Sequence, residues 1–162
     1  MTSKIKAILV PVDFSACSRR AFEWALEIAR AFGASVDVLH AWTAPAYVSP
    51  TVAVLVGSGS PAQTLEAIAR QEASRQLAEF LNSFGPIAGV PVKTRIEFGF
   101  EADVIVAAAQ AYDLVVIGTH GRKGISHLIM GSVAEKVIRR ATCPVLTVRD
   151  ASQRPEHEES RS

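Results

Sequence analysis

The spacing of hydrophobic residues changes along the chain, and each spacing predicts a type of element. The segment 7–12 (AILVPV) is continuously apolar, as is typical of a strand covered on both faces. From Phe22 to Phe32, apolar residues recur every three or four positions, which predicts an amphipathic helix. Ser15 is positioned to cap this helix and Gly33 to end it. Strands and helices continue to alternate, so the sequence predicts an α/β fold with a parallel sheet and right-handed crossovers.

The third predicted strand differs from the others in its pattern. Val92, Thr94 and Ile96 alternate with charged residues, which predicts one face in water and therefore an edge strand. Residues 43–60 contain two prolines and a Gly-Ser run, and are expected to form a long crossover loop. The remaining elements are expected as strands at 36–41, 113–117 and 144–149, and as helices at 63–84, 102–109 and 133–140.

Length and composition indicate one folded domain. A chain of 162 residues, 49% of them hydrophobic, is long and apolar enough to bury a core on both faces of one sheet. We expect the domain to span residues 1–149. Residues 150–162 contain almost no apolar side chains and are expected to form a disordered polar tail.

Charge, hydropathy and cysteine content exclude several classes of protein. The 17 Lys and Arg residues nearly balance the 16 Asp and Glu residues, which argues against non-specific nucleic-acid binding. No apolar run approaches the roughly 20 residues needed to cross a bilayer, so no membrane span is expected. Cys17 and Cys143 lie far apart without a C-x-x-C motif, which argues against a disulfide framework or a zinc site and favours a reducing cytoplasm.

The most informative motif is the segment 118–132 (GTHGRKGISHLIMGS), which reads G-x2-G-x9-G-S between a predicted strand and a predicted helix. Glycines at the end of a strand let the backbone approach a ligand without interference from a Cβ atom. A Gly-Ser pair that opens a helix offers free N–H groups, a hydroxyl and the positive end of the helix dipole. The motif therefore predicts an anion cradle, with a nucleotide phosphate as the expected anion. The alternative is that these glycines only shape a surface turn.

Other nucleotide and catalytic motifs do not match. The glycine segment is not a Walker A loop, G-x4-G-K-[ST], and VDFS follows the first strand where a dinucleotide motif would stand. An acyl-transfer elbow, G-x-S-x-G, is absent too. No carboxylate pair, metal-ligand cluster or Ser-His-Asp constellation stands out. We therefore expect binding with at most slow ATP hydrolysis rather than efficient catalysis.

Several polar residues are candidates for contacts with a nucleotide, and most of them have a structural role that is equally compatible with the sequence. Asp13 follows the first strand at its carboxyl edge, where it could accept hydrogen bonds from ribose hydroxyls or an adenine N–H, or help to cap the first helix. His40 is expected to be a satisfied core histidine. The loop carries four potentially cationic side chains: His120, Arg122, Lys123 and His127. These side chains could neutralise a triphosphate, but a solvated polar loop has the same composition.

The chain resembles the universal stress protein family, specifically its ATP-binding branch. The resemblance is carried by VPVDFS at 10–15, by the glycine pattern of 118–132 and by TCPVLTV at 142–148. It implies a Rossmann-like fold of the adenine nucleotide alpha hydrolase type, with a five-stranded parallel sheet in the order 3-2-1-4-5. It also implies that backbone near the first two strands holds adenine, that Asp13 meets the nucleoside and that the glycine loop holds phosphates. The implied nucleotide contacts are Pro11, Val12, Asp13, Ala41, Gly118, His120, Gly121, Arg122, Gly131, Ser132 and Val133.

Two functions are compatible with this sequence. The first is an ATP-binding stress-response or signalling module whose occupancy controls an unidentified protein partner, with Mg²⁺ bound mostly through phosphate oxygens and water. The second is a non-nucleotide, chaperone-like or interaction protein that works through its dimer surface. We expect a homodimer because the last strand is apolar and lies at the far edge of the implied sheet. The residues expected at the dimer interface are Val145, Leu146 and Val148.

Overall fold

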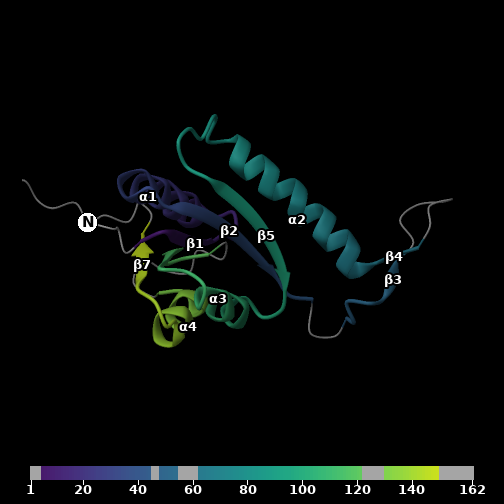
Figure 1. The fold of residues 1–162 in the computed structure, drawn as a ribbon. Helices are drawn as coiled ribbons and strands as arrows, with labels where there is room; N and C mark the ends of the chain where they lie inside the picture. The colour runs from purple at the N-terminus through teal and green to yellow at the C-terminus, as the bar shows by residue number, and fades with distance from the viewer. Residues whose placement is uncertain (1–4, 45–47, 55–61, 122–129, 150–162) are drawn as a thin grey trace, which may run out of the picture.

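The computed structural model describes residues 5–44, 48–54, 62–121 and 130–149. Within these residues, a five-stranded parallel sheet forms the centre of the molecule (Figure 1). Its strands are β1 (Ala7–Pro11), β2 (Ser35–Trp42), β5 (Val92–Phe98), β6 (Leu114–Gly118) and β7 (Val145–Val148). Their order is β5-β2-β1-β6-β7, which is 3-2-1-4-5 when only these strands are counted. The predicted fold class, the implied strand order and the edge position of β5 are confirmed.

Helices cover both faces of the sheet. They are α1 (Ala16–Phe32), α2 (Leu65–Asn82), α3 (Glu101–Ala109) and α4 (Ser132–Arg140). α1 and α2 pack on one face, and α3 and α4 pack on the other (Figure 1). Alternate side chains of a strand point to opposite faces, so β1 contributes to both cores. Ile8 packs with the residues of α1 and α2, and Leu9 packs with those of α3 and α4.

The sequence signals at both ends of α1 are confirmed. The hydroxyl of Ser15 accepts a hydrogen bond from the N–H of Ser18 at 3.2 Å and so caps the helix. Gly33 ends the helix in the left-handed region, with φ of 68°, where glycine carries no steric penalty. Cys17, in the first turn, is buried and free, as expected of a small apolar thiol.

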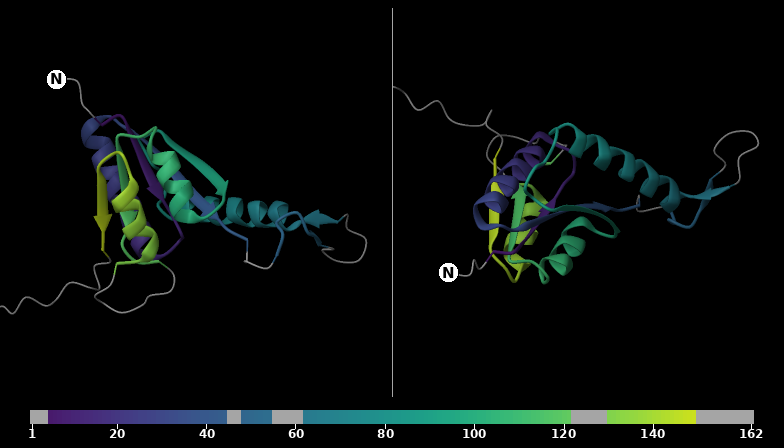
Figure 2. Two further views of the ribbon diagram at one scale, coloured as in Figure 1. Left: turned by 90° about the horizontal axis from the view of Figure 1, so that it is seen from below. Right: turned by 45° about the horizontal axis from the view of Figure 1, so that its top comes forward.

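The expectation of a plain loop at residues 43–60 is wrong in part. β3 (Ala53–Val54) pairs antiparallel with β4 (Gln63–Thr64) and forms a separate two-stranded sheet. The long helix therefore begins at Leu65, later than predicted. α2 reaches beyond the central sheet, and β3 and β4 lie at its far end (Figure 2). The expected tail at 150–162 lies outside the described residues. No helix in the described part of the chain is long and apolar enough to span a membrane.

Candidate functional site

The candidate site lies at the carboxyl ends of β1 and β6. β2 and β5 follow on one side of β1, and β6 and β7 lie on the other, so the strand order reverses here. Ligands of open parallel sheets usually bind at such a reversal point. Two connections meet at this edge: residues 12–15, between β1 and α1, and residues 119–131, between β6 and α4. Residues 122–129 of the second connection, including the predicted contact Arg122, lie outside the described residues.

Asp13 uses its carboxylate in one of the two ways that the sequence left open, by supporting the start of α1. Its Oδ1 atom accepts hydrogen bonds from the N–H of Ser15 at 3.1 Å and from the Ser15 hydroxyl at 2.6 Å. Asp13 therefore supports the residue that caps α1. Its Oδ2 atom faces Gly121, where an added Cβ atom would stand only 2.7 Å away. One carboxylate oxygen is thus engaged by the start of α1, and the other lines the glycine loop.

The three glycines of the motif are required for different reasons. A Cβ atom on Gly118 would stand 2.8 Å from the backbone of Cys17, so this glycine lets β6 pack closely against the start of α1. Gly121 leaves room for the carboxylate of Asp13. On Gly131 a Cβ atom would stand 3.0 Å from the carbonyl oxygen of Thr119. Gly118 therefore serves packing within the fold, whereas Gly121 and Gly131 keep the loop close to the groups of the site.

Thr119 closes the base of the glycine loop, and the sequence analysis did not single it out. It is buried, its N–H donates to the carbonyl of Val148 at 2.9 Å, and its carbonyl accepts from the N–H of Gly131 at 2.7 Å. These bonds tie β6 to β7 and to the start of α4. No signal in the sequence indicated that Thr119 joins these segments, because it stands at a variable position of the motif. β6, β7 and the start of α4 meet only in the folded chain.

His120 contributes a buried, unpaired ring nitrogen. Its Nδ1 atom lies 2.9 Å from the hydroxyl of Thr119, and its carbonyl lies 3.4 Å from the hydroxyl of Ser15. The Nε2 atom is buried and has no hydrogen-bond partner among the described residues. Buried polar atoms are nearly always hydrogen-bonded in folded proteins, so this nitrogen, in the residue next to Gly121, is compatible with a ligand at this edge of the sheet.

The first turn of α4 opens toward the same connection. Gly131 is its N-cap, Ser132 is exposed, and Val133 is half-buried against the α3–α4 core. The first N–H groups of a helix have no partner within the helix, and they carry the positive end of its dipole. This end of α4 therefore suits an anion. Among the described residues, no group of three or more His, Cys, Asp or Glu side chains could hold a metal ion.

Backbone groups at the ends of β1 and β2 form the other side of the site. Val12 is buried, its N–H donates to the carbonyl of Leu39 at 2.9 Å, and its carbonyl lies 2.8 Å from Nδ1 of His40. His40 is thus satisfied, as predicted, and its Nδ1 carries the proton because a carbonyl can only accept. β1 ends at Pro11, opposite Leu39. Alternate residues of a strand direct their backbone N–H and carbonyl groups to the same side. The backbone groups of Ala41 therefore face the β1 side, as those of Leu39 do, but beyond the end of β1.

Comparisons with known proteins identify relatives along most of the chain. A model of the Universal stress protein family matches residues 4–149. A universal stress protein of Methanocaldococcus jannaschii is 35% identical over 147 residues, which are 89% of this chain and 82% of that protein.

Two solved structures share the fold. A universal stress protein in complex with cAMP has a TM-score of 0.65 and 23% identity, over 92% of this chain and 100% of the other. A universal stress protein family protein from Arabidopsis thaliana with AMP bound has a TM-score of 0.58 and 24% identity, over 94% and 97% of the two chains.

Proposed function

This chain belongs to the universal stress protein family, and we propose that it is an ATP-binding member that acts as a nucleotide-dependent module in stress response or signalling. One observation carries the proposal: at one edge of the sheet lie the Asp13 carboxylate, the close backbone of Gly121 and the buried Nε2 atom of His120, which has no partner within the part of the chain that the structure describes. The two related structures with cAMP and AMP bound support an adenine nucleotide as the ligand.

The adenine base is assigned to the ends of β1 and β2. Both backbone groups of Val12 are already engaged within the protein, so they offer no hydrogen bond to a base. The N–H and carbonyl of Ala41 face the β1 side, beyond Pro11, the last residue of β1 that pairs with β2. An N–H donor beside a carbonyl acceptor matches adenine, which presents an amino donor next to ring acceptors. Pro11 and Val12 would then pack on the base, and the N–H and carbonyl of Ala41 would form hydrogen bonds with its edge.

The phosphates are assigned to the glycine loop and the start of α4. N–H groups of Ser132 and Val133, the hydroxyl of Ser132 and the ring of His120 would hold phosphate oxygens, with the helix dipole favouring their negative charge. Asp13 would meet the ribose, because a carboxylate accepts hydrogen bonds from hydroxyls but repels phosphate. Mg²⁺, if bound, would be held mainly by phosphate oxygens and water.

Hydrolysis of the bound nucleotide is expected to be slow. Asp13 is the acidic side chain that lines the described part of the site, and it is engaged by Ser15 and assigned to the ribose. Efficient phosphoryl transfer uses a positioned base and acidic metal ligands. A phosphate-release assay should therefore give a turnover far below the roughly 10 s⁻¹ typical of enzymes. Turnover at ordinary enzyme rates would contradict the assignment as a binding module.

Mass spectrometry and calorimetry test the proposal directly. Protein purified under mild conditions and then denatured should release an adenine nucleotide, and the stripped protein should bind added ATP. GTP is the matched control, because guanine presents an acceptor where adenine presents an amino donor. We expect GTP to bind at least about tenfold more weakly, the equivalent of about 1.4 kcal/mol. A chain that neither retains nor binds nucleotide would instead favour the chaperone-like or interaction protein.

A further inference from the structure

Phe14 has a backbone conformation that its side chain disfavours. Its φ is 66°, and it is the only residue other than glycine with a positive φ among the described residues. In this left-handed region the Cβ atom crowds the backbone, so a bulky residue there is an outlier that the surrounding structure must hold in place. Phe14 lies between two groups of the site, the carboxylate of Asp13 and the helix-capping hydroxyl of Ser15.

The ring of Phe14 supplies the contacts that hold this conformation. It lies against the ring of His40, with centroids 4.6 Å apart, and meets Phe80 edge-on at 5.9 Å. His40 is fixed in turn by its bond to Val12, and Phe80, a residue of α2, is buried in the core between the helices and the sheet. The ring therefore spans from the end of β2 to α2, and both neighbours are themselves held in place.

The consequence of the strained backbone is the position of Asp13. With residue 14 in the left-handed region, the chain turns back so that Oδ1 of Asp13 reaches both the N–H and the hydroxyl of Ser15. The same turn directs Oδ2 of Asp13 toward Gly121. An unrestrained residue 14 would favour a negative φ, in which this turn would not form.

We propose that Phe14 is a positioning residue that determines the preference of the site for the ribose hydroxyls. Its ring, held between His40 and Phe80, keeps Asp13 oriented to accept hydrogen bonds from the 2′ and 3′ hydroxyls. The inference rests on the proposed nucleotide site and goes beyond it. Selectivity for ribonucleotides depends on a side chain that need not touch the ligand, and α2 is linked to the site through the Phe80 contact.

The test compares ATP with 2′,3′-dideoxy-ATP, which keeps the base and the triphosphate but lacks both hydroxyls. Calorimetric titration of the full chain should show that ATP binds at least about tenfold more tightly, because a hydrogen bond to a charged group is lost with the analogue. In Phe14→Ala this ratio should fall below about threefold, while the affinity for the dideoxy nucleotide stays within about threefold of the parent value. In Phe14→Gly the backbone adopts both positive and negative φ without strain, so its ratio should lie between those of Phe14→Ala and the parent, and it remains informative if Phe14→Ala folds poorly.

Phe84→Ala is the matched control. Phe84 belongs to the same aromatic cluster. The centroid of its ring lies 4.9 Å from that of Phe22 and 5.1 Å from that of Phe80. Its removal should lower the thermal midpoint and leave the ATP to dideoxy-ATP ratio unchanged. The inference is overturned if both Phe14 variants keep the parent ratio, if Phe84→Ala lowers the ratio equally, or if the parent binds both nucleotides equally well. A parent protein that binds neither nucleotide would overturn the proposed function itself.

Discussion

A single methyl group at position 121 would meet a carboxylate. In Gly121→Ala the new Cβ atom would stand 2.7 Å from Oδ2 of Asp13, closer than non-bonded atoms approach. The Asp13 carboxylate would have to shift away from position 121, and its bonds to Ser15 through Oδ1 would be strained. We expect the affinity for ATP, measured by calorimetric titration, to fall at least about tenfold, as for one lost charge-assisted hydrogen bond.

A double variant tests whether position 121 acts through Asp13. In Asp13→Ala the carboxylate is gone, so adding Gly121→Ala should reduce ATP affinity no further. Additive losses in the double variant would contradict this mechanism, because they would mean that the methyl group blocks the ligand without involving the carboxylate.

The start of α4 offers a second comparison, between Gly131→Val and Ser132→Ala. A Cβ atom at position 131 would press on the carbonyl of buried Thr119, 3.0 Å away, and a branched side chain would extend into the proposed phosphate site. We expect Gly131→Val to weaken ATP binding by more than about 3 kcal/mol. Ser132 is exposed, so its replacement should cost only one hydrogen bond, about 1–3 kcal/mol. If either variant titrates like the parent, the phosphate assignment is wrong.

At the residue scale, the sequence predicted the types of side chain better than their contacts. The position of Asp13 after an apolar strand was enough to place it at the site edge. Its contact with Gly121 joins residues more than a hundred positions apart, and no local pattern encodes such a contact. The left-handed backbone of Phe14 had no signal either, since aromatic residues rarely adopt it. Such strained residues are found where the surrounding fold, not local preference, sets the backbone.

The periodicity of apolar residues predicted the existence of α2 but not the residue at which it begins. The sequence predicted this helix correctly, and its buried residues Ala73, Leu77 and Phe80 recur at helical spacing. The predicted start was wrong because residues 63–64 pair with β3 instead. A strand of two residues has no periodicity to detect, and its pairing depends on a segment some ten residues away.

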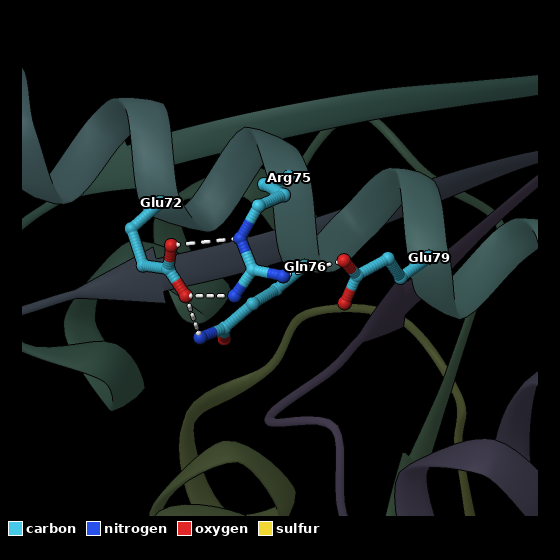
Figure 3. Close-up of polar contacts among 4 residues, drawn as sticks. All are labelled: Glu72, Arg75, Gln76 and Glu79. Carbon is cyan, nitrogen blue, oxygen red and sulfur yellow. Dashed lines mark hydrogen bonds and ion pairs between the residues drawn. The ribbon is translucent and has the colours of Figure 1, made fainter.

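The exposed face of α2 carries a charged network that makes a pH prediction possible. Arg75 donates to Glu72 and Glu79, and Gln76 donates to Glu72 (Figure 3). The hydrogen bond from Arg75, followed by that from Gln76, lowers the pKa of Glu72 from 4.5 to about 2. A depressed folded pKa contributes stability above pH 4.5, and this contribution is lost as pH falls through about 2. NMR titration should find the Glu72 carboxyl ionised well below pH 4.5.

Two variants distinguish the contributions to this shift. Arg75→Gln removes the positive charge and should return the pKa of Glu72 most of the way to 4.5, whereas Gln76→Ala should return it less. The network lies on the surface, so its effect on the free energy of unfolding should be small and should weaken in high salt. A Glu72 midpoint near 4.5 in the parent protein would mean that these ion pairs do not persist in solution.

At the scale of the whole molecule, the two edges of the sheet differ. β5 was correctly predicted as an edge because its charged residues alternate with apolar ones. β7 forms the opposite edge and carries no charged residue, and nothing in its own pattern distinguishes an edge strand from a buried one. Of the residues expected at a dimer interface, Val148 is only 6% exposed and already packs in the α1–α2 core, whereas Leu146 is 37% exposed.

This exposed edge makes the homodimer testable. An edge strand presents unpaired N–H and carbonyl groups, and pairing β7 with β7 of a second copy about a two-fold axis would satisfy them and cover Leu146. Light scattering at micromolar concentration should therefore give about twice 17.3 kDa. Leu146→Lys should shift the mass toward the monomer. Phe98→Lys, at a similarly exposed position on the opposite edge strand, should leave the dimer intact. A monomeric parent protein, or a dimer broken only by Phe98→Lys, would refute pairing through β7.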